Sequence, residues 1–247
     1  MLLAIVVVGL SVLTFAFVGQ KNITPANPQP GDIVIVANPT DLSKIAGISK
    51  FRSCFGHVYG FSSAFEGKEA QGSLKHYFVP KEIYLGTNNA VPVFAPFDGN
   101  IIYTEQGTDQ FIIQQRPFDG WVFGFTHVII LSSLKQGSDV KAGQLVGYAA
   151  LTKTHAFDIF LQTQKRPGFH NFDWYNGQDS IFNHMTSDVY VQYVAKGVTK
   201  ENSIIPKAIR DTNPCPCDYS APSPSGSPYC NFLPIPYNDQ DNSVMLK

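Results

Sequence analysis

The sequence predicts a mainly β fold with a helix and a disulfide-tied tail towards its C-terminus. Between Val91 and Gln164, short apolar runs are separated by Asp-Gly, Gly-Ser-Asp and Ala-Gly steps, which are typical of a compact sheet with tight turns. The chain has 20 glycines, 17 prolines and 13% aromatic residues but only 15% charged residues, a mixture that favours a turn-rich, exported β protein. Its four cysteines, an even number, indicate two disulfides.

Residues 1–20 are expected to direct export. Met1–Val18 is almost entirely apolar, and as a helix it would be roughly 27 Å long, close to the thickness of a bilayer core. It is interpreted either as a secretory signal peptide that is removed or as an uncleaved membrane anchor, with a buried core helix as a third alternative. The first two place the rest of the chain outside the cell, secreted or at the outer face of the membrane. Residues 21–31 contain several prolines and no periodicity, which indicates a linker.

Residues 32–200 are expected to form one β domain with a long lead-in and a packing helix. Runs of β-branched and aromatic residues bounded by turn residues predict its strands. These are a buried strand at Asp32–Ala37, then Lys75–Val79, Val91–Phe94, Asn100–Thr104, Gln110–Gln114, Val122–Leu131, Gln144–Tyr148 and Ala156–Leu161.

A single helix is predicted after the strands. Thr186 is a suitable N-cap, Asp188 lies in the first turn and Lys196 in the last, and Gly197 follows. This order of charges complements the helix dipole. The apolar face expected to pack on the sheet consists of Val189, Tyr190, Tyr193 and Val194.

Residues 201–247 form a Cys- and Pro-rich extension that contains three of the four cysteines. Cys215 and Cys217 are too close in sequence to pair without strain. Each is therefore expected to pair outward, with Cys54 and Cys230 as the partners, in an order that the sequence leaves open. A zinc site, the alternative, lacks a second pair of ligands at suitable spacing.

Four motifs follow one another along residues 91–164: Pro92-Val-Phe-Ala-Pro-Phe-Asp-Gly, Phe125-Thr-His-Val, Asp139-Val-Lys-Ala-Gly-Gln-Leu-Val-Gly and Thr154-His-Ala-Phe-Asp-Ile. Together they resemble the M23 (LytM, lysostaphin-like) metallopeptidase family, whose domain is a duplicated hybrid motif. The resemblance implies an antiparallel, M23-like β-sheet or barrel-sandwich domain.

The resemblance also implies a set of candidate site residues. The family holds a zinc ion with two histidines and an aspartate, and further histidines act in catalysis. His76 and His155 are accordingly the candidate metal ligands, and His127 is the candidate catalytic residue. Zinc is the cofactor that this set would bind.

The match to the family's metal motifs is incomplete. In the first motif, H-x-x-x-D, Pro80 stands where the aspartate is expected. In the last, H-x-H, Phe157 stands where the second histidine is expected. Glu82 and Asp158 are the candidate substitute carboxylates. His57, His170 and His184 match no family position and are interpreted as structural.

Three functions remain open at this point. The first is an exported, degenerate M23-like domain of the cell envelope that binds a peptide or glycan without cutting it. The second is an active zinc metallopeptidase of the M23 type, and the third is a structural envelope or filament subunit. A net charge of −1 and the lack of a basic tract argue against a nucleic-acid partner, and membrane contact is expected only through the N-terminal segment. A ligand groove, if present, is expected to be lined by Tyr77, Phe94, Trp121 and Phe157.

Overall fold

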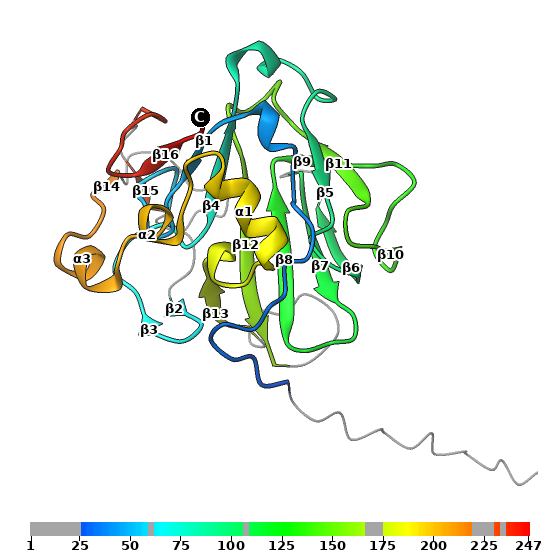
Figure 1. The fold of residues 1–247 in the computed structure, drawn as a ribbon, viewed down its shortest axis with the longest axis horizontal. Helices are drawn as coiled ribbons and strands as arrows, with labels where there is room; N and C mark the ends of the chain where they lie inside the picture. The colour runs from blue at the N-terminus through cyan, green and yellow to red at the C-terminus, as the bar shows by residue number, and fades with distance from the viewer. Residues whose placement is uncertain (1–25, 59–61, 106–108, 166–174, 219–229, 233–235) are drawn as a thin grey trace, which may run out of the picture.

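The computed structural model describes residues 26–58, 62–105, 109–165, 175–218, 230–232 and 236–247. The predicted export segment, residues 1–20, lies outside these ranges. Within them, no helix is long and apolar enough to cross a membrane. Strands make up most of the regular structure and a few short helices lie around them, so the predicted mainly β fold is confirmed (Figure 1).

The strands form one large sheet, a second small sheet and a two-stranded ribbon. The large sheet contains β1 (Ile45–Ser49), β2 (Ser62–Ser63), β3 (Gly67–Lys68), β4 (His76–Pro80), β6 (Gly99–Glu105), β7 (Gln110–Gln115), β8 (Trp121–Thr126), β10 (Asp139–Val140), β12 (Phe157–Gln164), β13 (Tyr175–Asp179) and β16 (Ser243–Met245). Its main path is β10-β6-β7-β8-β12-β13-β2-β3, while β4, β1 and β16 branch from β12. The second sheet has the order β5-β11-β9, from Pro92–Phe94, Leu145–Ala149 and Val128–Ile130. The ribbon pairs β14 (Cys217–Asp218) with β15 (Asn231–Phe232).

Strand β12 is the centre of the large sheet. One edge of it pairs with β8, and its other edge is shared between β4 and β13. Because side chains alternate along a strand, Phe157, Ile159 and Leu161 enter the main core. Phe160 packs in a separate small cluster on the other face. Asp158, two residues before Phe160, therefore lies on the face opposite the main core.

Helix α1 (Ser187–Val194) confirms the predicted packing helix, but it ends before Lys196, which was expected in its last turn. The Thr186 side chain accepts a hydrogen bond from the Val189 N–H, as an N-cap does. Val189 and Tyr193 are buried, and Tyr193 meets the edge of Phe182 in the short helix η4 (Ile181–Asn183). The buried face is narrower than predicted, because Val194 is largely exposed. The other helices within the described residues are η1 (Leu42–Lys44), η2 (Glu82–Tyr84), α2 (Lys200–Ser203) and α3 (Lys207–Thr212).

The buried strand predicted at Asp32–Ala37 does not form. Its backbone N–H groups bond to two separate segments instead. Those of Val34 and Ile35 donate to the His184 carbonyl. Those of Val36 and Ala37 donate to the Pro96 carbonyl. Ile35 makes only an isolated bridge, to Met185. With no continuous neighbour to pair with, this segment connects elements rather than extending a sheet.

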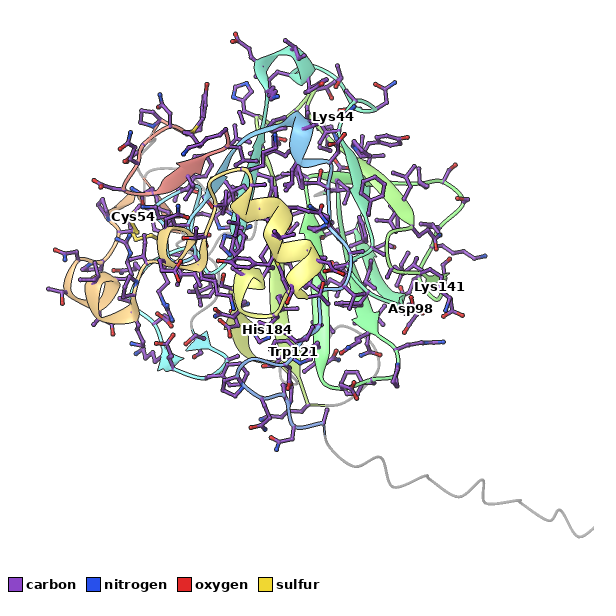
Figure 2. The ribbon with its side chains drawn as sticks, viewed as in Figure 1. Lys44, Cys54, Asp98, Trp121, Lys141 and His184 are labelled. Atoms are coloured by element: carbon purple, nitrogen blue, oxygen red, sulfur yellow. A yellow bond between two sulfur atoms is a disulfide. The ribbon has the colours of Figure 1, made fainter. Side chains whose placement is uncertain are left out.

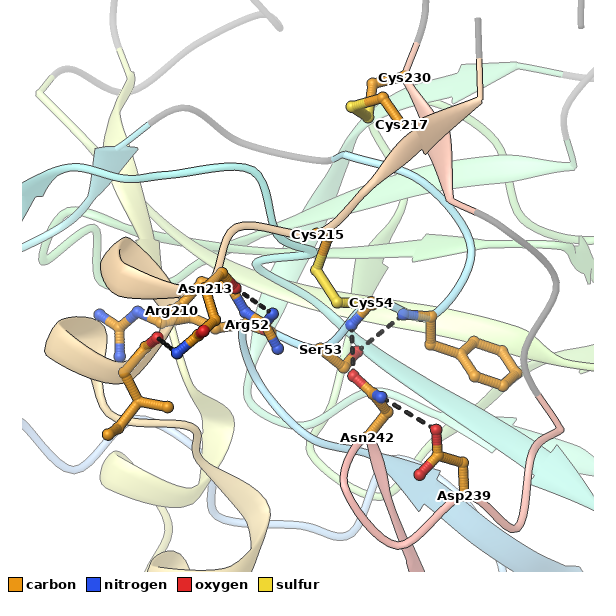
Figure 3. The surroundings of a disulfide bond; sticks show 12 residues. Arg52, Ser53, Cys54, Arg210, Asn213, Cys215, Cys217, Cys230, Asp239 and Asn242 are labelled. Carbon is orange, nitrogen blue, oxygen red and sulfur yellow. Dashed lines mark hydrogen bonds between the residues drawn. A yellow bond between two sulfur atoms is a disulfide. The ribbon is translucent and has the colours of Figure 1, made fainter. Parts of the chain in front are cut away.

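The predicted cysteine pairing is confirmed, and the structure supplies its order. Cys54 bonds Cys215 across 161 residues, and Cys217 bonds Cys230 across 13 (Figure 3). The C-terminal tail is also attached by strand pairing, since β16 pairs with β1 in the large sheet. Asn242 adds to this attachment by accepting a hydrogen bond from the Cys54 N–H at 2.6 Å. Two disulfides are typical of proteins in oxidising, extracellular compartments.

Candidate functional site

A pocket of about 360 Å³ opens where β4, the turn before β12 and the C-terminal tail meet. Apolar and aromatic side chains make up most of its wall, and two imidazoles and the hydroxyl groups of one threonine and two tyrosines add polar groups. Tyr77 lies so close to Gly56 that a Cβ at this glycine would collide with the phenol ring. The lining residues are Phe55, Tyr77, Val79, His127, Thr154, His155, Ala156, Pro236 and Tyr237.

A buried ion pair lies on the face of the sheet from which Tyr77 enters the pocket. Lys75 comes just before β4 and is two residues from Tyr77. Its Nζ is 2.9 Å from Asp158 Oδ1, and the two side chains are 1% and 0% exposed. Burial lowers the pKa of Lys75, and the Asp158 carboxylate opposes this effect. The ammonium therefore neutralises the carboxylate of β12 beside the pocket.

The imidazole of His57 also contacts the Lys75 ammonium. Its Nδ1 lies 2.9 Å from the Val58 carbonyl oxygen, which can only accept, so Nδ1 carries the proton. Nε2 is then free to accept from Lys75 Nζ, which is 3.3 Å away. Burial, reinforced by the Lys75 charge, lowers the pKa of His57 to about 4. His57, interpreted from the sequence as structural, thus contacts the buried ion pair beside the pocket.

His127 enters the pocket because the chain turns sharply at this residue. The sequence predicts one strand over Val122–Leu131, but that strand is split into β8 and β9, which belong to different sheets. The break is at His127, whose φ of 60° is in the left-handed region that few non-glycine residues adopt. Its Nε2 is 4.0 Å from Asp158 Oδ2. Burial lowers the pKa of His127, and Asp158 opposes the shift.

His76 lies on the opposite face of β4 from the pocket, because Tyr77 and Val79 are the residues that face it and side chains alternate. Its Nδ1 is 2.8 Å from the Ser49 carbonyl oxygen and its Nε2 is 3.0 Å from Ser180 Oγ. The ring also packs edge-on against Phe182. Both nitrogens are therefore occupied in the core, and the structure brings together only His127 and His155 of the three candidate histidines.

The donors around the pocket do not fit a zinc site as they stand. His155 is an exposed side chain, and Ala156 and Val79, which also line the wall, carry no ligand atom. The buried carboxylate beside His127, Asp158, is paired with Lys75. Across the described ranges, no three His, Cys, Asp or Glu residues are grouped so as to hold a metal ion, whereas zinc needs at least three protein ligands.

Only one of the four aromatic residues predicted to line a groove, Tyr77, lines this pocket. Phe157 is fully buried and stacks on Phe78. Trp121 is also fully buried, with its ring centroid 4.5 Å from that of His184 (Figure 2). The sequence argument missed two contributors, Phe55 and Tyr237, because they come from the segments next to the cysteines, far from the motifs in the chain.

Lys75 was also missed, although the sequence contains a signal for it. When His76 is aligned with the first residue of the metal motif, the residues selected on β4 are those whose side chains point away from the pocket. Shifting the match by one residue places Lys75 and Val79 on the pocket face, four residues apart. A lone lysine at the start of an apolar strand is itself unusual, because buried lysines are found almost only with a partner.

The structural role of His76 can be tested through pH. Burial lowers the pKa of His76 from 6.5 to about 4. Below pH 6.5 the unfolded chain takes up a proton that the folded chain does not bind until pH falls to about 4. The stability contributed by neutral His76 is therefore complete above pH 6.5 and is lost as pH falls towards 4. At ~1.4 kcal/mol per unit, this loss is about 3 kcal/mol.

Urea unfolding at neutral pH and near pH 4 measures this contribution. Between the two conditions, His76→Gln is expected to lose about 3 kcal/mol less of its free energy of unfolding than the wild type. His155→Gln, which changes an exposed imidazole, is the matched control and should keep the wild-type pH dependence. An unchanged dependence in His76→Gln would show that the buried ring does not control acid stability.

No protein-family model and no curated protein matches the chain. Several solved structures resemble it. The antimicrobial peptidase lysostaphin from Staphylococcus simulans is 18% identical, with 51% of this chain and 48% of that one covered and a TM-score of 0.34. A zinc-containing peptidase from Vibrio cholerae is 15% identical, with 53% and 37% covered and a TM-score of 0.34.

A chain of the SpoIIQ–SpoIIIAH pore-forming complex is 15% identical, with 68% of this chain and 100% of that one covered and a TM-score of 0.38. The match spans less than half of the length of the two peptidases.

Proposed function

We propose that this chain is an exported, M23-like binding protein of the cell envelope that holds a peptide or glycan in the pocket without cutting it. The observation that carries the proposal is the pocket itself. It combines the aromatic rings of Phe55, Tyr77 and Tyr237 with the imidazoles of His127 and His155 at one opening. An apolar hollow with a few polar groups is the usual form of a ligand site.

The chemistry of the pocket favours binding over hydrolysis. A metallopeptidase of this type polarises the scissile carbonyl and activates water with a bound metal. Here the nearby carboxylate, Asp158, is neutralised by Lys75 at 2.9 Å. What faces a ligand is a preformed surface of rings and imidazole N–H groups, suited to neutral amides and sugar hydroxyls. The ligand class, envelope peptide or glycan, follows from the M23 resemblance of the sequence motifs.

Binding is best tested with purified cell-wall sacculi and with synthetic crossbridge peptides, using the full chain purified without chelators. We expect retention on sacculi, or saturable binding of a peptide by calorimetry, without release of cleavage products. Tyr237→Ala and His127→Ala should each weaken binding by about tenfold or more, as truncating a central contact residue does. Tyr148→Ala, a tyrosine in β11 that does not line the pocket, is the matched control and should bind like the wild type.

Two results would contradict the proposal. Cleavage of the peptide by protein that contains stoichiometric zinc would replace it with the zinc metallopeptidase alternative. Lack of binding to every probe, or equal weakening by Tyr148→Ala and Tyr237→Ala, would remove the pocket from the function.

A further inference from the structure

The Lys75 ammonium lies where groups suited to binding a cation converge. Asp158 Oδ1 is 2.9 Å from Nζ and His57 Nε2 is 3.3 Å from it. The Tyr77 ring is also close, with its centroid 5.0 Å from Nζ. A carboxylate oxygen and an imidazole nitrogen with its lone pair directed inward are the donors that zinc and similar ions use. The ammonium thus occupies a ligand set that would also suit a metal ion.

A third potential donor lies beside the other oxygen of Asp158. His127 Nε2 lies 4.0 Å from the second carboxylate oxygen of Asp158, Oδ2. That oxygen is buried, and no described residue makes a hydrogen bond to it. A buried carboxylate oxygen without a hydrogen bond is costly, so Asp158 retains unused capacity to bind a cation on the side that faces His127.

We infer that Lys75 is the built-in cation of this site, and that its ammonium fills the volume in which Asp158, His57 and His127 would otherwise hold a divalent metal ion. Metal–ligand distances are about 2.0–2.2 Å, whereas the ammonium holds its partners at 2.9 and 3.3 Å. Asp158 and His57 must therefore each close in by about 1 Å around a metal ion. In the described part of the chain with Lys75 in place, no three donors are grouped so as to hold a metal. The inference concerns the metal alone and does not depend on what the pocket binds.

Removing the ammonium tests the inference directly. Lys75→Ala vacates the volume, and Lys75→His vacates it while adding an imidazole. Both variants, made in the full chain, are titrated with Co²⁺, whose visible absorption reports its coordination, and with Zn²⁺ by calorimetry. We expect stoichiometric uptake by both variants and none by the wild type. Adding Asp158→Asn to Lys75→Ala should weaken Co²⁺ binding by at least about tenfold, the range in which metal sites respond to the loss of a supporting group.

The matched control replaces an exposed carboxylate outside the site. Asp98→Asn in the Lys75→Ala background should bind Co²⁺ as tightly as Lys75→Ala alone. If either Lys75 variant is unstable without metal, added Zn²⁺ should raise its melting temperature, since binding to the folded state stabilises it. Failure of both variants to bind metal or to be stabilised by it would overturn the inference, as would stoichiometric Zn²⁺ binding by the wild type.

Discussion

Replacing Cys54 and Cys215 together with serine is expected to lower the free energy of unfolding by about 5 kcal/mol. This disulfide closes a loop of 161 residues, and the entropy that a crosslink removes from the unfolded chain grows with loop length, reaching ~5 kcal/mol at this size. The bond also joins Cys54 to Cys215, which follows α3 (Figure 3). Phe55, the residue after Cys54, lines the pocket. Urea unfolding of the oxidised wild type and the double variant measures the difference.

The second disulfide provides the matched control. Cys217–Cys230 closes a span of only 13 residues, for which the same relation gives about 3 kcal/mol. Cys217→Ser/Cys230→Ser should therefore cost clearly less than Cys54→Ser/Cys215→Ser. Equal losses would show that loop length is not what sets the contribution of these bonds. The hydrogen bond from the Cys54 N–H to Asn242 remains possible in the serine variant, so its loss does not confound the comparison.

Most of the sheet could be predicted because its signals are local. Strands β4, β5, β6, β7 and β11 lie within one residue of the runs that predict them, and β12 continues three residues beyond its run. The N-cap at Thr186 was equally readable, since one side chain satisfies one backbone N–H. Asp32–Ala37 has the same β-branched composition but no strand to pair with. A strand needs a neighbouring strand to pair with. The tertiary fold decides whether one is present, and residue composition alone does not show it.

The site was less predictable because it depends on which face each residue takes. A shift of one residue along β4 exchanges His76 for Lys75 at the pocket, since strand side chains alternate. The break at His127 was also hidden, because an apolar run continues on both sides of it and only the left-handed backbone separates β8 from β9. Tyr237 and His57 reach the site through the disulfide-tied segments, so no local pattern connects them with the motifs.

Breaking the Lys75–Asp158 pair from one side is expected to destabilise the protein by about 3–5 kcal/mol, the usual cost of leaving one buried charge without its partner. Asp158→Asn removes the carboxylate that faces the buried ammonium, and Lys75→Met removes the ammonium that faces the buried carboxylate. With side chains only 1% and 0% exposed, water cannot replace either partner. Chemical unfolding of the two single variants at neutral pH gives the losses.

The double variant Lys75→Met/Asp158→Asn isolates the interaction energy between the two charges from their contacts with other residues. Because it removes both charges, it should be less destabilised than the sum of the single losses, with a coupling of about 2–3 kcal/mol. The exposed pair Lys141–Asp98, with Nζ and Oδ2 a similar 2.8 Å apart, is the matched control (Figure 2). Its equivalent cycle, Lys141→Met/Asp98→Asn, should show no resolvable coupling, since water screens both charges. Strictly additive losses at Lys75 and Asp158 would mean that burial of each side chain, and not the charge between them, holds this part of the site together.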